Sequence, residues 1–379
     1  MAITKIDITM LEDVGGANNL VKLDANAKIP AAAGVSLLNV PGPFTSTSDP
    51  AINSNKTLGF EWVNSTSGEM YVCTDATVGE NIWINVGEGI GDIAVFPGTA
   101  YGYGMGGGNN INVIDRFSFT SQSNATDVGD CTRYYYNPHT GSSSSTHGYA
   151  AGGDDGSNGP YSHNVINKVQ FVATADATDV GDLTLARYSS AGASSSNHGY
   201  AAGGRTAAPT NVDNIDKWTF ASDANATDVG NLLSGVRHMA GHSSQTYGYK
   251  SGGYPTTDSI EKWSFATDGN STDVANLVTS RRNIAGTSSI IYGYTCGAYP
   301  VSDEIEKFIF ATDTNATDVG NLYADNDMFT GISATDYGYL TGGRNNANVI
   351  QRFSHTSDGD SVDWADLTIS KTLVAGTQY

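Results

Sequence analysis

Six copies of one short motif constrain the fold of this 379-residue chain more than any other feature. HGYAAGG occurs at 147–153 and again at 198–204, and looser copies read YGYGMGG, YGYKSGG, YGYTCGA and YGYLTGG. The middle tyrosines are separated by 46, 51, 49, 45 and 45 residues; they are Tyr103, Tyr149, Tyr200, Tyr249, Tyr294 and Tyr339. Self-similarity at such a period indicates a repeat architecture, in which each copy is one structural unit.

One copy, residues 200–249, shows the internal order of the repeat. GYAAGGR is followed by NIDKWTF, by SDANATDVGNL and by VRHMAGHSSQTYGY. NIDKWTF is rich in β-branched and aromatic residues on both alternating faces, which predicts a strand buried on both sides. We expect GYAAGG to be the inner strand of each sheet, ending on its glycines. NATDVGN predicts a turn, because Asn and Asp side chains bond back to nearby amides.

The C-terminal segment SKTLVAGTQY predicts how the repeat array ends. It aligns with SRRNIAGTSS of an earlier copy, but no GYxxGG stretch follows it. We expect it to return and complete the sheet that begins near 101–107. That pairing removes a sheet edge that would otherwise invite aggregation.

Composition narrows the class of protein. Forty-five glycines, ten prolines and 15% charged residues favour short strands and tight turns, and no segment has the periodicity of a helix. A formal charge of −20 excludes nucleic acid and anionic membranes as expected partners, and no stretch is long and apolar enough to span a bilayer. Three scattered cysteines form no disulfide framework. Cys131 stands where other copies carry leucine, so we expect a small buried residue.

The repeat resembles the kelch repeat. Both have a double glycine, a strand, a turn followed by Leu, and then an Arg and small residues leading to the next copy. Arg187, Arg237 and Arg282 fit the kelch arginine position, Asp327 lies near it in the fifth copy, and Trp364 fits the kelch tryptophan position, where other copies have Val. The resemblance covers about 90–379. It implies an all-β fold, with residues 91–379 forming a six-bladed kelch-like β-propeller.

The first ninety residues differ from the repeats. NNLVKLDANAKIPAAAGVSLLNV has no core pattern of its own, and LGFEWVNSTSGEMYVCTDATVGENIWINVG reads as hairpins. Both resemble segments of bacteriophage tail fibres. The second match is the more specific, and it aligns Trp62, Gly68, Tyr71, Cys73, Asp75, Thr77 and Trp83. The resemblance implies a virion-attachment and oligomerisation segment at 1–45, a small β-hairpin fibre module at 46–90, other virion tail proteins as partners, a homotrimer and a place in the phage tail.

Candidate binding residues lie in the segments after the glycine pairs, which vary in length and composition. Loops on a rigid scaffold often carry binding, and aromatic residues there could stack on sugar rings. For any single position an ordinary surface loop remains the alternative. The candidates for contact with a host surface polysaccharide or receptor are Tyr161, His163, Arg205, Tyr254, Tyr299 and Arg344.

No catalytic residue, cofactor or metal is predicted. HExxH, GxSxG and Cys–His clusters are missing from the sequence. Turns such as Asp223-x-Asn225-x-x-Asp228 could hold calcium, but each is explained as a plain turn. One basic residue per repeat fits structural ion pairs or backbone contacts better than catalysis; these are Arg116, Lys168, Lys217, Lys262, Lys307 and Arg352.

The sequence therefore predicts a phage tail-fibre or tail-appendage protein whose distal propeller contacts the host surface. One alternative is an enzyme, a depolymerase that cleaves surface polysaccharide. The other is an architectural decoration protein with no receptor role.

Overall fold

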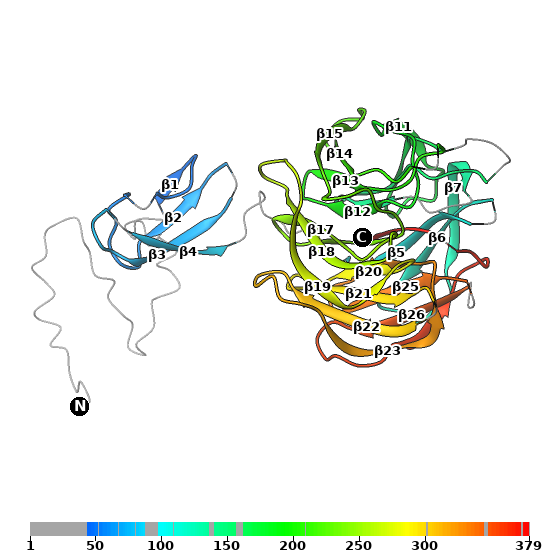
Figure 1. Cartoon of the computed structure of the whole chain (residues 1–379). Coiled ribbons are helices and arrows are strands. Elements are labelled where there is room, and N and C mark those ends of the chain that lie inside the picture. Colours follow the sequence, from blue (N-terminus) through cyan, green and yellow to red (C-terminus); the bar gives the residue numbers. More distant parts are fainter. Residues whose placement is uncertain are drawn as a thin grey trace, which may run out of the picture. The chain divides into compact units, whose positions relative to one another are not determined.

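The computed structural model describes residues 44–378 except 52, 67, 80, 88–97, 109, 136–139, 157–161, 209, 301, 345–347 and 373. The described residues form strands and no helix, so none of them builds a helix that could cross a membrane. The chain divides into two compact units, Met1–Asp92 and Ile93–Tyr379 (Figure 1). The predicted attachment segment at 1–45 lies outside the described residues up to position 43.

The first unit contains one four-stranded sheet. Its strands are β1 (Phe44–Ser46), β2 (Glu61–Asn64), β3 (Met70–Asp75) and β4 (Ile82–Gly87), in that order across the sheet. The β2–β3 and β3–β4 pairs are antiparallel, as the hairpin pattern predicts, whereas β1 pairs with β2 in parallel. The sheet begins at Phe44, two residues before the predicted start of this module at 46.

An aromatic cluster stabilises this small sheet. The ring of Trp62 lies 4.5 Å from that of Phe44 and 5.8 Å from that of Trp83, centroid to centroid. The two indole N–H groups donate to backbone carbonyls, Trp62 to Ser48 at 2.8 Å and Trp83 to Ala51 at 3.2 Å. The two tryptophans of the fibre-like pattern thus hold the segment that follows β1.

The described residues of the second unit form six four-stranded antiparallel sheets in a propeller-like arrangement (Figure 1). The first sheet contains β28 (Ala375–Gln378), β5 (Tyr101–Gly107), β6 (Ile111–Ser118) and β7 (Thr126–Tyr135). The second sheet contains β8 (Thr140–Ser143), β9 (His147–Ala151), β10 (Val165–Gln170) and β11 (Thr178–Asp182). The third sheet contains β12 (Ala191–Ser194), β13 (His198–Ala202), β14 (Asn214–Thr219) and β15 (Thr227–Asn231). The fourth sheet contains β16 (Ala240–Ser243), β17 (Tyr247–Ser251), β18 (Thr257–Ser264) and β19 (Thr272–Arg281). The fifth sheet contains β20 (Ala285–Ser288), β21 (Tyr292–Ala298), β22 (Ser302–Ile309) and β23 (Thr317–Asn326). The sixth sheet contains β24 (Phe329–Ser333), β25 (Tyr337–Gly342), β26 (Val349–Ser354) and β27 (Val362–Asp366).

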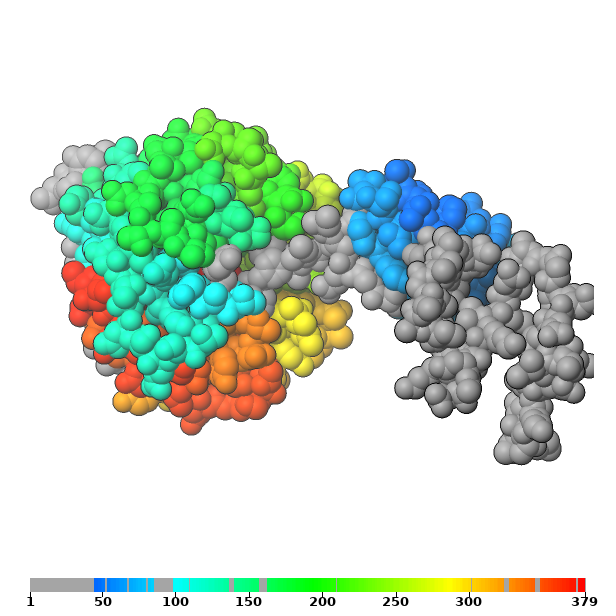
Figure 2. Space-filling view, turned by 180° about the vertical axis from the view of Figure 1, so that it is seen from behind, coloured from blue at the N-terminus to red at the C-terminus, as the bar shows by residue number. Residues whose placement is uncertain are grey.

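The last strand of the chain completes the first sheet. β28 pairs with β5, with Thr377 opposite Tyr103, so the return of the C-terminal segment predicted from the sequence is observed. Figure 2 shows red surface from the last part of the chain next to cyan surface from the first part of the second unit.

Two assignments within the repeat were wrong. The GYxxGG stretch is the second strand of each sheet. The innermost strand is the shorter AGHS-like segment, which precedes that stretch in sheets two to six and is the C-terminal β28 in the first sheet. The predicted turn NATDVGN is mostly strand, because Thr227–Asn231 pairs with β14 as the outermost strand β15. The glycine pair does end the second strand: Gly203 and Gly204 have φ of 63° and 110°, which a side chain would disfavour.

Six glycines bring the innermost strands together. Each innermost strand carries one, and a Cβ added to it would collide with the carbonyl oxygen of the equivalent glycine in the preceding sheet. The contacts run in cyclic order, because Gly141 meets Gly376 in the same way. We call this set the glycine ring; it consists of Gly141, Gly192, Gly241, Gly286, Gly331 and Gly376. Only glycine permits backbones to approach so closely.

The recurring tyrosine joins each sheet to the next. All six middle tyrosines are buried, and each ring packs on an aromatic ring of the following sheet at a centroid distance of 4.8–4.9 Å. The pairs are Tyr103–Phe171, Tyr149–Phe220, Tyr200–Phe265, Tyr249–Phe310, Tyr294–His355 and Tyr339–Phe119. Cys131 lies in the same core and is buried, as expected; burial raises the pKa of its thiol to about 12.

The outermost strands are linked in the same cyclic order. An Asn or Asp side chain before each outermost strand accepts a hydrogen bond from a backbone N–H of the preceding sheet's outermost strand. The bonds run from Asp130 to Asp176, Asp182 to Asn225, Asn231 to Asn270, Asn276 to Asn315, Asn321 to Asp360 and Asp366 to Asn124. These amides and carboxylates therefore hold neighbouring sheets together.

The glycine ring predicts that Gly241→Ala is strongly destabilising. The added methyl group would force the Gly192 carbonyl away, and overpacking of this kind costs about 2–3 kcal/mol of unfolding free energy. Val278→Ala, at a half-exposed outer-strand position, is the control and should change stability little. Thermal denaturation followed by circular dichroism checks both variants. Equal melting temperatures for the two variants would contradict the assigned role of the ring.

Candidate functional site

The three arginines assigned to one kelch-like position occupy two different positions. Arg187 is fully buried, and its Nη2 lies 3.3 Å from Oδ2 of the equally buried Asp216 in the next sheet. Arg237 and Arg282 are half-buried and line a cavity instead. The residue equivalent to Arg187 in the fourth repeat is Arg281, one position earlier than the sequence alignment indicated.

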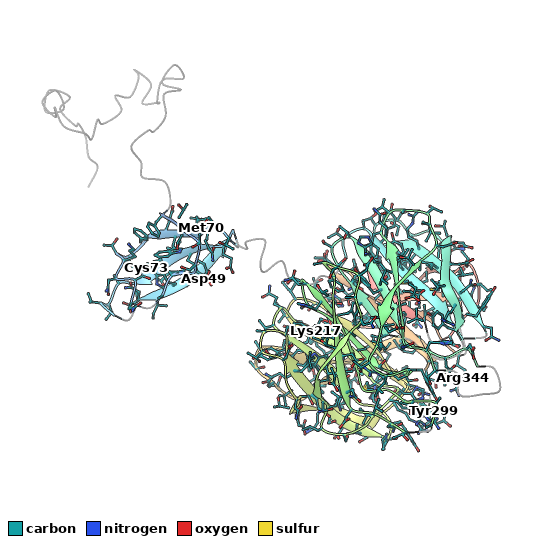
Figure 3. The ribbon with its side chains drawn as sticks, turned by 90° about the horizontal axis from the view of Figure 1, so that it is seen from above. Asp49, Met70, Cys73, Lys217, Tyr299 and Arg344 are labelled. Atoms are coloured by element: carbon teal, nitrogen blue, oxygen red, sulfur yellow. The ribbon has the colours of Figure 1, made fainter. Side chains whose placement is uncertain are left out.

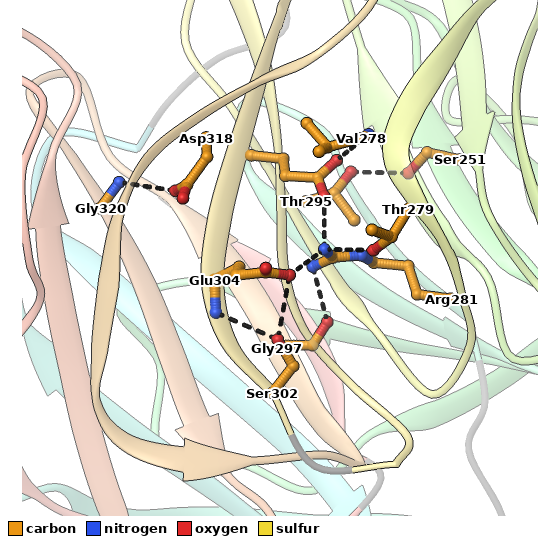
Figure 4. A network of polar contacts seen from close by, with 11 residues as sticks. Ser251, Val278, Thr279, Arg281, Thr295, Gly297, Ser302, Glu304, Asp318 and Gly320 are labelled. Carbon is orange, nitrogen blue, oxygen red and sulfur yellow. Dashed lines mark hydrogen bonds and ion pairs between the residues drawn. The ribbon is translucent and has the colours of Figure 1, made fainter.

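Arg281 makes a structural network in the interior (Figure 4). Its guanidinium pairs with Glu306 and Glu304 and donates to Thr279 Oγ1 at 2.9 Å. Burial raises the pKa of Glu306, whereas the charge of Arg281 opposes that shift. Glu306 also accepts the Val278 N–H at 2.9 Å, so this buried carboxylate joins the fourth sheet to the fifth.

Arg237 and Arg282, the other two arginines, line a cavity of about 290 Å³. Two kinds of segment build it: the connections from one sheet to the next, and the segments that follow the second strands of sheets four to six. The cavity is lined by Arg237, His238, Tyr254, Arg282, Asn283, Tyr299, Met328 and Arg344.

Arginine and tyrosine alternate along this cavity. Tyr254 has the guanidinium carbons of Arg237 and Arg282 at 4.5 and 4.6 Å from its ring centroid. Tyr299 has those of Arg282 and Arg344 at 4.7 and 5.5 Å, and Figure 3 shows Tyr299 and Arg344 next to each other. We call these five residues the Arg–Tyr ladder. Because both rings contact two guanidiniums, the tyrosines position arginines here rather than presenting bare rings.

A hydrogen-bonded backbone frame holds the ladder. The Tyr254 N–H donates to the Arg237 carbonyl at 2.7 Å, and the Tyr299 N–H donates to the Arg282 carbonyl at 2.9 Å. His238, Asn283 and Met328, which also line the cavity, have left-handed φ of 57°, 56° and 60°. The Asn283 N–H donates to the His238 carbonyl at 2.9 Å, so the connections that carry the ladder arginines are tied to each other.

The cavity is electropositive. Arg344 Nη2 lies 3.1 Å from Oδ2 of Asp327, and Arg237 Nη1 donates to Asn211 Oδ1 at 2.9 Å. Among the side chains that the structure describes, no carboxylate lies within ion-pair distance of Arg237 or Arg282. Burial and the nearby arginines lower the pKa of His238 to about 4, so its imidazole is neutral near pH 7.

The structure brings together three of the six residues predicted for binding, Tyr254, Tyr299 and Arg344. Arg205 belongs to the adjoining strand bridge with Tyr188, and its charge contributes to the lowered pKa of Arg237, for which burial is the larger cause. His163 does not line the cavity; its Nε2 lies 3.8 Å from Oδ2 of Asp155, and burial lowers its pKa.

Tyr161 lies outside the described residues. Sequence reasoning assigned Arg237 and Arg282 a structural position and missed His238, Asn283 and Met328. These five residues lie in the connections between sheets, which reach the cavity beside the loops after the glycine pairs. The sequence could have indicated them, because the segments between the last strand of one sheet and the first strand of the next also vary from copy to copy.

The basic residues that recur once per repeat have structural contacts, as expected, but of two kinds. The four lysines pair with an Asp of the following sheet at 2.5–2.7 Å, in Lys168–Asp223, Lys217–Asp268, Lys262–Asp313 and Lys307–Asp358. The two arginines pack on tyrosine rings, Arg116 on Tyr101 at 5.1 Å and Arg352 on Tyr337 at 4.3 Å.

The turns considered for calcium use their side chains within the protein. Asp223 pairs with Lys168, and Asn225 accepts the Asp182 N–H. In the described part of the chain, no group of three or more His, Cys, Asp or Glu side chains is arranged to hold a metal ion.

Comparison of the chain with protein-family models and with curated proteins returns no match. What the cavity does must therefore be argued from its own geometry.

Two adjacent arginines provide a test of this division between structural and cavity-lining positions. Arg281→Met should cost about 3–5 kcal/mol of unfolding free energy, because it leaves Glu306 buried without its cation. Arg282→Met should cost at most about 1 kcal/mol, since it removes only half-exposed cation–π contacts. Urea denaturation of both variants measures the difference. Equal losses would show that Arg282 is structural as well.

Proposed function

We propose that residues 93–379 form a closed six-bladed, kelch-like propeller. Four sets of contacts support it. The glycine ring, the tyrosine–aromatic pairs and the outer hydrogen bonds each join the sixth sheet to the first, and the β28–β5 pairing completes the first sheet with the last strand of the chain. Such a scaffold holds its connecting loops in fixed positions, which suits them for recognition.

We infer that the chain is a phage tail-fibre or tail-appendage protein whose propeller binds a glycan of the host surface. The observation that carries the binding role is the Arg–Tyr ladder, a preformed cavity with stacked cations and a neutral imidazole. Ligand sites are commonly concave and contain a few fixed polar groups among larger side chains. The proposed role is binding without catalysis.

The viral assignment rests on the first ninety residues. Their resemblance to tail-fibre segments supports attachment to other virion tail proteins, assembly as a homotrimer and a location in the phage tail. The separate small sheet, with its own aromatic cluster, is consistent with a connecting module.

The full chain, labelled with a fluorophore, should bind saturably to susceptible cells in a panel of bacterial strains. Periodate oxidation of the cell-surface glycans should abolish that binding. Tyr299→Ala should weaken binding about tenfold, because it removes the support of Arg282 and Arg344. Tyr323→Ala removes an exposed tyrosine of the outer strand β23 and should bind like the parent chain.

Flow cytometry measures all four conditions. Binding to no strain, binding that survives oxidation, or equal loss in both variants would contradict the proposal.

A further inference from the structure

The charge of the ladder is opposite to that of the whole chain. The chain carries 19 basic and 39 acidic residues, yet three of the described residues that line the cavity are arginines and none of them is acidic. Asp327 lies at the side of the ladder and pairs with Arg344. Arg205 and Arg282 lie close enough for their charges to lower the pKa of Arg237, after burial. Cations crowd together in this way at an energetic cost, and an anion bound between them would reduce it.

Part of this charge is unsatisfied within the protein. The Nε atoms of Arg237 and Arg205 are buried and have no hydrogen-bond partner among the described residues. Buried donors in folded proteins are nearly always paired, so such atoms call for an explanation. Beside them, Arg282 is engaged by two tyrosine rings but by no described carboxylate. A guanidinium stacked through its face keeps its in-plane N–H groups available for an anion.

The size of the cavity restricts what can bind. Its volume of about 290 Å³ lies just below the range of ~300–1,000 Å³ that is usual for ligand pockets. One charged sugar residue with part of its neighbour fits that volume. A long polyanion would also have to lie along the surrounding surface of a protein with a formal charge of −20.

We propose that the Arg–Tyr ladder binds the anionic group of an acidic glycan, a carboxylate or phosphate carried on a sugar residue. This rests on the proposed function and specifies its ligand class. Arg237 and Arg282 bind the anion, and Tyr254 and Tyr299 hold the guanidiniums in place. Met328 and Asn283 contact the sugar ring that carries the charge.

The test compares three small probes that differ in charge. Glucuronate carries a carboxylate, glucose 6-phosphate carries a phosphate, and glucose is neutral. Each is titrated into the full chain at low ionic strength, and ligand-observed NMR measures the dissociation constant. We expect at least one charged sugar to bind tenfold or more tightly than glucose, and the preferred one identifies the source of the anion.

Two variants locate the binding. Arg282→Gln should weaken binding of the preferred charged sugar at least fivefold. Arg116→Gln removes an equally charged side chain that also packs on a tyrosine, Tyr101, outside the cavity; it should leave binding unchanged. A thermal melt of each variant confirms that it is folded.

The outcomes separate this inference from the proposed function. Equal affinity for all three sugars, or equal weakening in the two variants, overturns the anion site even where the chain binds cells. Tight binding of a charged sugar, lost only in Arg282→Gln, establishes the anion site even where no bacterial strain is bound.

Discussion

The close approach of six glycine backbones, each against the next, is the constraint on which the rest of the second unit depends. With no side chain at these positions, each innermost strand lies against the carbonyl of its neighbour. Two further sets of contacts between sheets then recur in all six copies. The tyrosine of the second strand reaches an aromatic ring of the next sheet, and the outer amide reaches the preceding strand. The stability of such an array is approximately the sum of the stabilities of its repeats and of the interfaces between neighbouring repeats.

Function is best sought where this repetition stops. Positions that hold sheets together carry the same residue type in nearly every copy, whereas the connections to the ladder differ from sheet to sheet. Tyr188 pairs with Arg205, Arg237 with Tyr254 and Arg282 with Tyr299 in equivalent strand bridges. The three bridges have equivalent places in the fold but carry different side chains. Because Arg237–Tyr254 and Arg282–Tyr299 are neighbouring bridges, arginine and tyrosine alternate along the ladder. The scaffold supplies the spacing, and the sequence of each connection supplies the chemistry.

The strands and their repetition were predictable from the sequence because their pattern is local. Tyrosine spacing and the NIDKWTF-like runs located two strands of each sheet, and the unmatched C-terminus predicted the pairing of β28 with β5. The outermost strand was read as a turn because Asn and Asp, typical turn formers, here bond to another sheet. In the other five sheets the innermost strand was missed, because four or five mostly small residues carry no periodicity.

The binding residues were predicted in part, for a related reason. Tyr254, Tyr299 and Arg344 followed from the variable loops, whereas Arg237 and Arg282 did not. Arg281 and Arg282 are adjacent and identical in type, and only the contact with Glu306 reveals which one is buried. Such a choice depends on a partner about 25 residues away, and local spacing does not encode it.

Hydrogen exchange, measured by mass spectrometry on the full chain, tests the cyclic arrangement most directly. If the six sheets are joined through β28 and β5, amides of Ala375–Gln378 and Tyr101–Gly107 should exchange as slowly as those of His198–Ala202 in the third sheet. Fast exchange at the C-terminal strand, with the third sheet still protected, would show that the first sheet stays open. That result would contradict the central claim.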